Sequence, residues 1–348
     1  MAPDNEKSSF RRYFAIGLLS IVAFFAPVWF WIVQEPLVYL DKEYPMWLAK
    51  MQLIQNRQVG GLVILGDSRA VAGLIPARIG PAVVNLAFGG GTPIDAYYAS
   101  QEIVIGSPLP KAVVISFAVD HFNGAEVFWG RSVEFGFLNL KDVDEVLSRS
   151  RALKDNIIFG TESPGDLDAR LEGFLYAIKF PSYYFPALFQ NTVYGVDNRY
   201  AGNRKMFDLV LSNRGQGYFG SANGSVDPES EGVPKTFMPS KLLDEYFNRT
   251  LALLHSRNIP AYFISMPHNA ASDRLYASGI EEEFDAYLDN YAARYSNFHI
   301  LGDRFPSYPS EYFGDPSHLN ERGATRWSSY VAQLLNDSRV EGGPFGIQ

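Results

Sequence analysis

Short apolar runs alternate with longer amphipathic stretches along most of the chain beyond residue 58. The runs are rich in valine, isoleucine and leucine and lack a consistently polar side, as is typical of strands buried on both faces of a sheet. They occupy Leu62–Leu65, Val83–Ala87, Ala112–Phe117, Ala261–Ser265 and Phe298–Leu301. The stretches between them predict helices over Pro93–Ile105, Ser240–Arg257, Ile280–Tyr295 and Glu321–Leu335. The pattern therefore predicts an α/β fold, a three-layer parallel sheet covered by helices on both faces, within residues 59–340.

The alternation stops between about residues 122 and 239. This is far longer than an ordinary connection and predicts a large insertion with its own structure. Aromatic residues gather from Phe174 to Phe185. One possibility is that they line a groove or rest on a membrane surface. We expect instead that they cover the insertion's own core. The stretch Ser212–Pro234 is rich in glycine, asparagine and serine and predicts an exposed loop.

The N-terminal region follows a different pattern. Phe14–Val33 holds no charged residue and is long enough to cross a bilayer as a helix. Lysine and arginine precede it and acidic residues follow it, so the positive-inside rule places the N-terminus in the cytoplasm and the remaining chain outside. A cleavable signal peptide is the alternative. Cleavage after Ala26 would put Phe24 three positions before the cut and Pro27 directly after it, which makes a poor site.

These patterns predict five parts of the chain. Residues 1–13 form a cytoplasmic tail, 14–33 an uncleaved transmembrane anchor and 34–58 a partly helical connecting segment. Residues 59–340 form the extracytoplasmic domain, and 341–348 form a C-terminal tail.

Composition excludes several classes of function. The chain has no cysteine, which excludes disulfides, thiolate catalysis and cysteine metal sites. Its formal net charge of −8 argues against nucleic acid as a partner. The five histidines are scattered, without a pair at helical spacing. We therefore expect no metal site and no cofactor.

The first candidate for chemistry is Gly66-Asp67-Ser68, directly after the first predicted strand. In an open parallel sheet, reactive groups gather at the carboxyl ends of strands, where loops meet helix N-termini. Glycine allows a tight turn before Ser68, and amides at the start of a following helix favour developing negative charge. The alternative is that Asp67 or Ser68 only caps this helix.

The second candidate is Asp315-Pro316-Ser317-His318, just before the last predicted helix. The spacing lets Asp315 and His318 point to the same side of one turn. The carboxylate then holds one imidazole nitrogen while the other faces a hydroxyl. In the alternative, Asp315 is a helix cap, Pro316 is the first helical residue and His318 has no chemical role.

The third candidate is the glycine-rich stretch Phe88–Thr92, after the second predicted strand. Its three glycines let the backbone approach a ligand closely and offer amide donors to an oxyanion. A phosphate-binding loop is the competing interpretation, but the lysine of nucleotide loops and the dinucleotide spacing are both missing.

Together, these motifs resemble those of the SGNH (GDSL-type) hydrolase superfamily. Gly66-Asp67-Ser68 is similar to its first motif, and Asp315–His318 is similar to its last. The resemblance covers about residues 60–120 and 260–336 and leaves out the insertion. It implies a flavodoxin-like three-layer sheet.

The resemblance also implies roles for individual residues. Ser68 would be the nucleophile, His318 the general base and Asp315 its orienting partner. The amides of Ser68 and Gly90 would form the oxyanion hole.

The sequence departs from this family after the third predicted strand. The superfamily usually has Gly-x-Asn-Asp there, and its asparagine completes the oxyanion hole, whereas this chain has Ala118-Val119-Asp120-His121. A carboxylate at Asp120 would repel an oxyanion, so His121, a backbone amide or Arg69 takes the role, or ordinary hydrolysis is weak. His268, after the fourth predicted strand, is a further candidate substrate contact. A histidine in a surface loop is the simpler expectation for it.

The anchor, the outward orientation and this departure are similar to one subgroup of SGNH-like proteins, which works beside membrane-bound O-acyltransferases. It includes the D-alanyl transfer protein of lipoteichoic acid synthesis and the acetylation proteins of exopolysaccharides. The resemblance implies an acyltransferase or acyl-esterase that acts on O-acyl groups of a cell-envelope polymer or polysaccharide through an acyl-Ser68 intermediate. It also implies a membrane-bound O-acyltransferase as partner, and a single-pass location in the inner or plasma membrane with the main domain periplasmic or extracellular.

Two other functions stay open. A catalytically weak, glycan-binding scaffold for such a partner is the main alternative. A phosphoesterase would need metal ligands, which the sequence does not offer.

Overall fold

The structure is a computed structural model that describes residues 4–40, 43–159, 166–179, 196–220, 222–227 and 236–338. Three predicted features lie wholly or partly outside the described residues. They are the aromatic residues at 183–185, parts of the loop predicted at 212–234, and the tail at 341–348.

Five parallel strands form the central sheet, in the order β2-β1-β3-β4-β6. They are β1 Leu62–Gly66, β2 Val83–Asn85, β3 Ala112–Ser116, β4 Ala261–Phe263 and β6 Phe298–Ile300. All five lie where the apolar runs predicted them. The chain moves to one side of β1 to form β2 and to the other side to form β3, so the carboxyl end of β1 lies at the point where the strand order reverses. Open α/β sheets bind their ligands at such a point.

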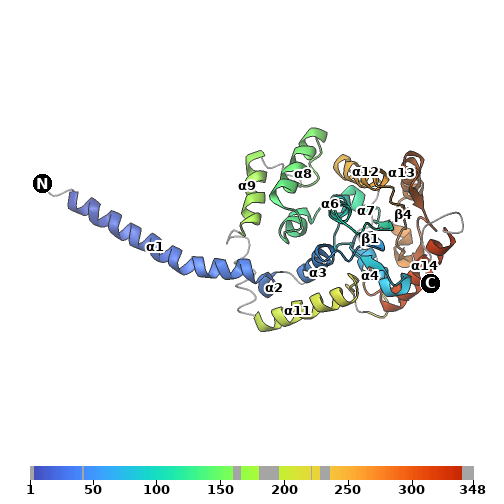
Figure 1. Ribbon diagram of the computed structural model, residues 1–348, viewed down its shortest axis with the longest axis horizontal. Helices are drawn as coiled ribbons and strands as arrows, with labels where there is room; N and C mark the ends of the chain where they lie inside the picture. Colours follow the sequence, from blue (N-terminus) through green and yellow to red (C-terminus); the bar gives the residue numbers. More distant parts are fainter. Residues whose placement is uncertain are drawn as a thin grey trace.

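Helices cover both faces of this sheet (Figure 1), which confirms the predicted α/β fold. Alternate strand side chains point to opposite faces, so that Val63 and Leu65 belong to one core cluster while Leu62 and Ile64 belong to another. The first face carries α6 Pro93–Val104, α12 Lys241–Ser256 and α13 Ile280–Arg294. The second carries α4 Ser68–Gly73, α5 Pro76–Ile79, α11 Val196–Ser212 and α14 Glu321–Asp337.

The predicted connecting segment contains a core helix, α3 Tyr44–Gln55. Trp47 and Leu53 belong to the first core cluster, and Met46 and Ala49 belong to the second. A helix buried nearly all round shows no polar stripe, which is why the pattern did not mark it as part of the domain. The boundary predicted at residue 58 is therefore too late, because α3 belongs to the globular fold.

Part of the insertion forms a buried cluster, the insertion core, together with helices of the sheet domain. The π-helix η1 (Phe128–Val133) and the helices α8 (Leu140–Leu153) and α9 (Asp166–Ala177) share a buried cluster with α6 and α12. Tyr176 of the predicted aromatic stretch stacks on Trp129, with ring centroids 6.1 Å apart, whereas Phe174 is exposed. Within the described part of that stretch, the aromatic residues thus divide between the insertion core and the surface.

The N-terminal helix α1, Asp4–Gln34, extends away from the globular part of the molecule (Figure 1). Its segment Ser9–Trp31 is long and apolar enough to cross a membrane, and none of it is buried. The indole Nε1 of Trp29 donates to the carbonyl oxygens of Ile178 and Lys179, at 3.1 and 3.0 Å. The end of α1 next to the domain is thereby tied to the end of α9, and α2 (Pro36–Tyr39) then leads to α3.

Several short elements complete the fold near the carboxyl edge of the sheet. They are α7 Asp120–Asn123, η3 Ala270–Leu275, η4 Ser310–Tyr312, and the two-stranded parallel sheet of β5 His268–Asn269 and β7 Ser307–Tyr308.

Asn85 connects the end of β2 to α4 and is fully buried. Its amide donates to the carbonyls of Ala70 and Leu74 at 2.8 and 3.0 Å, and its oxygen accepts from the Ala87 amide at 3.1 Å.

We expect Asn85→Ala to lower the free energy of unfolding by about 3 kcal/mol, because buried polar groups lose their partners. Denaturation followed by circular dichroism measures this. The exposed Asn290→Ala in α13 is the control, with an expected change within about 0.5 kcal/mol, and equal stability of the two variants would contradict the expectation.

Candidate active site

The turn between β1 and α4 presents Ser68 at the edge of the sheet. A Cβ atom at Gly66 would lie 2.0 Å from the carbonyl oxygen of Ser116, so only glycine lets β1 end this close to β3. Asp67 caps α4: its carboxylate accepts from the amides of Arg69 and Ala70, at 2.8 and 3.4 Å. The capping alternative is therefore correct for Asp67, whereas Ser68 is the first residue of α4 and keeps its hydroxyl for another partner.

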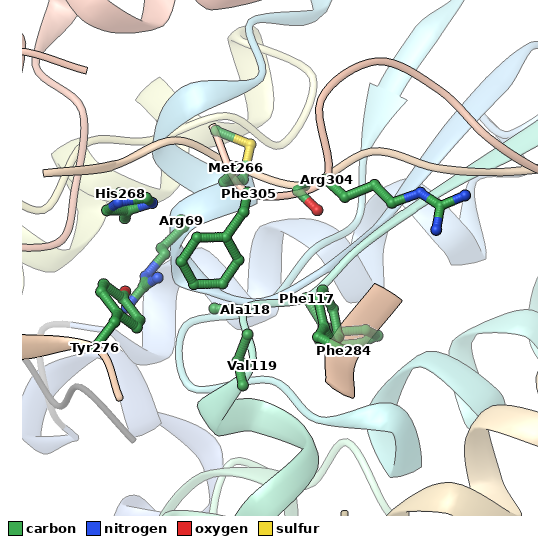
Figure 2. A pocket seen from close by; sticks show the side chains of 11 residues that line it. Arg69, Phe117, Ala118, Val119, Met266, His268, Tyr276, Phe284, Arg304 and Phe305 are labelled. Atoms are coloured by element: carbon green, nitrogen blue, oxygen red, sulfur yellow. The ribbon is translucent and has the colours of Figure 1, made fainter. Parts of the chain in front are cut away.

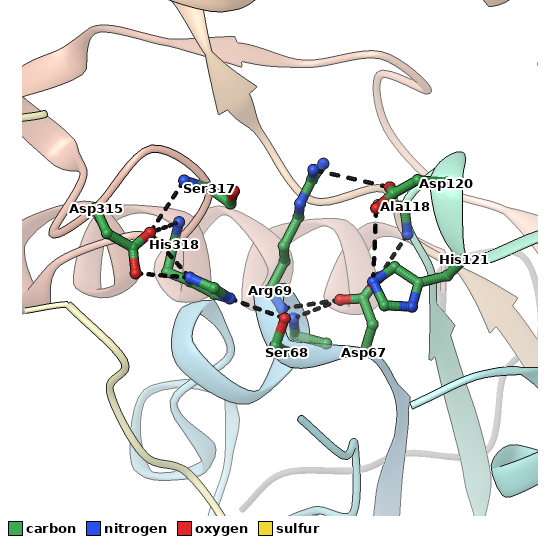
Figure 3. A network of polar contacts seen from close by, with 10 residues as sticks. Asp67, Ser68, Arg69, Ala118, Asp120, His121, Asp315, Ser317 and His318 are labelled. Carbon is green, nitrogen blue, oxygen red and sulfur yellow. Dashed lines mark hydrogen bonds and ion pairs between the residues drawn. The ribbon is translucent and has the colours of Figure 1, made fainter. Parts of the chain in front are cut away.

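That partner is His318 (Figure 3). Its Nε2 lies 2.8 Å from Ser68 Oγ, and its Nδ1 lies 2.9 and 2.8 Å from the two carboxylate oxygens of Asp315. A proton on Nδ1, facing the carboxylate, leaves Nε2 free to accept the proton of the serine hydroxyl. The three residues predicted from separate motifs thus form one continuous hydrogen-bonded chain, and their side chains are only partly buried.

The turn at Asp315 stabilises its negative charge. Burial alone would raise the pKa of Asp315, but its hydrogen bond and charge interaction with the His318 ring and the amides of Ser317 and His318 outweigh burial and lower it. These amides donate to Asp315 Oδ1 at 3.0 and 2.8 Å. The carboxylate therefore stays ionised and holds the imidazole in one orientation.

The glycine-rich loop lies against the turn that carries Ser68. The amide of Phe88 donates to the carbonyl of Gly66 at 2.9 Å, and a Cβ at Gly91 would lie 2.8 Å from the same oxygen. Gly90 has a φ of +67°, which side chains with a Cβ rarely adopt. The loop predicted to offer oxyanion donors is thus next to the nucleophile turn.

Asp120 and three neighbouring residues form a second polar network beside Ser68 (Figure 3). Arg69 Nη2 is 3.8 Å from Asp120 Oδ1. His121 Nε2 is 3.7 Å from Asp67 Oδ2 and 3.8 Å from Asp120 Oδ2. Asp120 therefore faces a cation, and His121 is held between two carboxylates. Arg69 stands between Ser68 and Asp120, with its side chain only 9% exposed.

The expectation that His268 lies in a surface loop is wrong. His268 is in β5, is 6% exposed, and its Nε2 is 2.6 Å from Asp273 Oδ1. Burial lowers the pKa of His268, Asp273 opposes this shift, and the charge of Arg69 adds to it. The sequence could not show this burial, because it depends on packing against Tyr276 and Phe305.

His268 and Arg69 line a small cavity at the carboxyl ends of β3 and β4 (Figure 2). Its volume of about 20 Å³ holds roughly one water-sized group. Ala118, Met266 and Tyr276 contribute to its walls. Of the four predicted contact residues, Arg69 and His268 line this cavity, whereas Asp120 and His121 belong to the polar network described above.

No sequence motif pointed to Phe219, which belongs to the insertion. Its ring packs on the His318 imidazole, with centroids 4.6 Å apart and planes at 32°. The chain that follows pairs with the loop before Asp315, since the amides of Ala222 and Gly224 donate to the carbonyls of Gly314 and Phe313, both at 3.1 Å. The only signal in the sequence is an aromatic pair, Tyr218-Phe219, within an otherwise polar stretch.

Neither models of known protein families nor curated protein sequences match this chain. Within the described ranges, no group of three or more His, Asp and Glu side chains is placed to hold a metal ion.

At neutral pH, Asp315→Asn should be less stable than the wild-type protein. The difference in melting temperature between the two should narrow as the pH falls. A carboxyl group whose pKa is lowered by folding stabilises the fold above its unfolded pKa of 3.8, and this contribution is lost as pH falls through the folded value. Melting temperatures of both proteins between pH 7 and pH 3 test this. Asp208→Asn, which changes an exposed carboxylate on α11, is the matched control and should leave the wild-type profile intact. A gap that stays constant with pH would contradict the role of the carboxylate charge.

Proposed function

We propose that this protein is a membrane-tethered serine enzyme that transfers or hydrolyses O-acyl groups of a cell-envelope polymer or polysaccharide. The observation that carries the proposal is the 2.8 Å contact between Ser68 Oγ and His318 Nε2, with Asp315 behind the imidazole. The motifs around it, and its place at the carboxyl edge of a parallel sheet, support membership of the SGNH hydrolase superfamily. A scaffold that only binds glycan does not need a serine hydroxyl aligned with an imidazole and a carboxylate.

The first half-reaction forms an acyl-serine. Ser68 Oγ attacks the ester carbonyl while His318 Nε2 takes the hydroxyl proton, and the tetrahedral oxyanion then collapses. The bond to the alkoxide oxygen breaks, and His318 returns the proton to that oxygen. In the second half, a polymer hydroxyl or water gives its proton to His318 and attacks the acyl carbon. The bond between the acyl carbon and Ser68 Oγ then breaks, and His318 returns the proton to Ser68 Oγ.

The oxyanion needs donors near Ser68. The amides of Ser68 and Gly90 are the candidates from the sequence, and the contact of the glycine-rich loop with Gly66 supports them. Arg69 is the strongest candidate for the role that asparagine has in the superfamily. Arg69 directly follows Ser68 in α4 and carries a cation, whereas Asp120 is an acceptor and His121 is held by carboxylates.

The tether and the exposed apolar length of α1 support a single-pass protein of the inner or plasma membrane. In this arrangement, the N-terminus is cytoplasmic and the domain faces the periplasm or the exterior. A membrane-bound O-acyltransferase that supplies the acyl group is the partner we propose.

The nucleophile can be tested directly. We expect a fluorophosphonate probe to label the wild-type protein on Ser68, as read by peptide mass spectrometry, and Ser68→Ala to remove the label. Ser68→Ala and His318→Ala should each lower turnover of acetyl esters by at least about 10³-fold, and the double variant should be no worse than either, because the pair acts as one unit. Folded wild-type protein that gives neither label nor turnover would overturn the enzyme and favour the scaffold.

The orientation can be tested with single cysteines, because the chain contains none of its own. We expect a membrane-impermeant maleimide to label Arg149→Cys, on the exposed face of α8, in intact spheroplasts. Ser9→Cys, at the start of the apolar segment, should react only after lysis. The reverse pattern would place the domain in the cytoplasm and contradict the proposed location.

A further inference from the structure

One face of α3 lies against the glycine-rich loop. Glu43, Trp47 and Lys50 follow one another at spacings of four and three residues, which places them on the same side of the helix. Each of them contacts a different residue of the chain that runs from the end of β2 into this loop. Residues on one side of α3 therefore lie along the chain that leads into the loop.

Lys50 makes the innermost of these contacts. Its Nζ donates to the carbonyl oxygen of Ala87 and lies 5.7 Å from the centroid of the Phe88 ring. Trp47, one turn earlier, stacks on Phe88 with ring centroids 4.2 Å apart. The two residues that lead into the glycines are thus held by a hydrogen bond and by an aromatic stack.

Glu43 makes the outermost contact, together with Arg131 of η1. The two form a bidentate ion pair, with both nitrogen–oxygen distances at 2.9 Å. A Cβ at Gly89 would lie 2.5 Å from Glu43 Oε2, and one at Gly90 would lie 2.7 Å from Arg131 Nη1. The ion pair therefore packs directly on the glycine backbone.

Packing alone does not account for a lysine at position 50. Its side chain is completely buried, which is rare for lysine, and burial lowers its pKa to about 7 against the opposing charge of Glu43. Methionine would fill a similar volume without the cost of desolvating an amine. What lysine adds is a donor to the Ala87 carbonyl at the entrance to the loop.

We propose that Lys50 is a positioning residue that fixes residues 87–90 in the conformation in which the loop amides serve the oxyanion. The expected effect of Lys50 on catalysis rests on the proposed function of Ser68. Its effect on the conformation of residues 87–90 does not. Because α3 follows α1 and α2, the segment next to the membrane anchor also supports the loop beside Ser68. Lys50 itself touches neither Ser68 nor a reacting atom.

The test compares Lys50→Met with Met46→Ala in the full-length protein in detergent. Met46→Ala shortens another buried side chain of α3, whose sulfur lies against Gly217 after α11, and leaves the Lys50 contact with Ala87 in place. For hydrolysis of 4-nitrophenyl acetate, we expect Lys50→Met to lower kcat at least tenfold with KM within twofold, since losing an oxyanion donor outright lowers kcat by roughly 10²–10³. Met46→Ala should keep the wild-type kcat per folded molecule. An unchanged kcat in folded Lys50→Met would overturn the proposal.

Hydrogen exchange separates failure of this inference from failure of the proposed function. We expect amides 87–91 to exchange at least tenfold faster in Lys50→Met than in Met46→Ala, whether or not the protein hydrolyses esters. Unchanged exchange would overturn the positioning role even if the enzyme is confirmed. Absence of ester turnover and of Ser68 labelling in the wild type would overturn the proposed enzymatic function. The exchange rates of amides 87–91 would still decide whether Lys50 positions the loop.

If Lys50→Met does not fold, Glu43→Gln tests the same face from its other end. It removes the charge of the pair with Arg131 at a position that is only partly buried. We expect faster exchange at Gly89 and Gly90 and a lower kcat at constant KM. Wild-type values for both would overturn the proposal.

Discussion

The hydrogen bond between Ser68 and His318 joins residues 250 positions apart in the chain, and it tolerates little error in the placement of either. The parallel sheet meets this requirement because all its strands end at the same edge. A second contact fixes the distance between α4, which carries Ser68, and α14, which follows His318. Ser328 of α14 donates to the Gly73 carbonyl at 3.0 Å and accepts from the Ile75 amide at 2.8 Å. The geometry of the triad is therefore a property of the core beneath it.

The buried carboxylate of Asp67 connects several segments at the carboxyl edge of the sheet. Asp67 is fully buried, and the cap of α4, the Ala118 amide at 2.7 Å and His121 supply its partners. A buried carboxylate without such partners would be strongly destabilising. The same group that starts the nucleophile helix thus also fixes the start of the segment after β3. One substitution there would disturb both sides of the site.

The sequence was sufficient wherever the signal is local. Strand positions followed from apolar runs, and the pairing of Asp315 with His318 followed from their spacing within one turn. It was insufficient where the outcome depends on distant packing. The apolar pattern of α3 resembled a linker because the helix is buried on several sides, and His268 is buried by aromatic residues from other segments. Phe219 reaches His318 only because the end of the insertion pairs with the loop before Asp315, and no local pattern encodes that contact.

The order of these parts along the chain has a consequence for biogenesis. The apolar helix α1 and Ser68 are synthesised before Asp315 and His318, and His318 follows Ser68 by 250 positions. At typical elongation rates of about 5–20 residues per second, roughly 12–50 s separate the translation of Ser68 from that of His318. During that interval, the growing domain holds a serine without a proton acceptor. A chain released before residue 315 would carry Ser68 without the His318–Asp315 pair that it contacts in the complete domain.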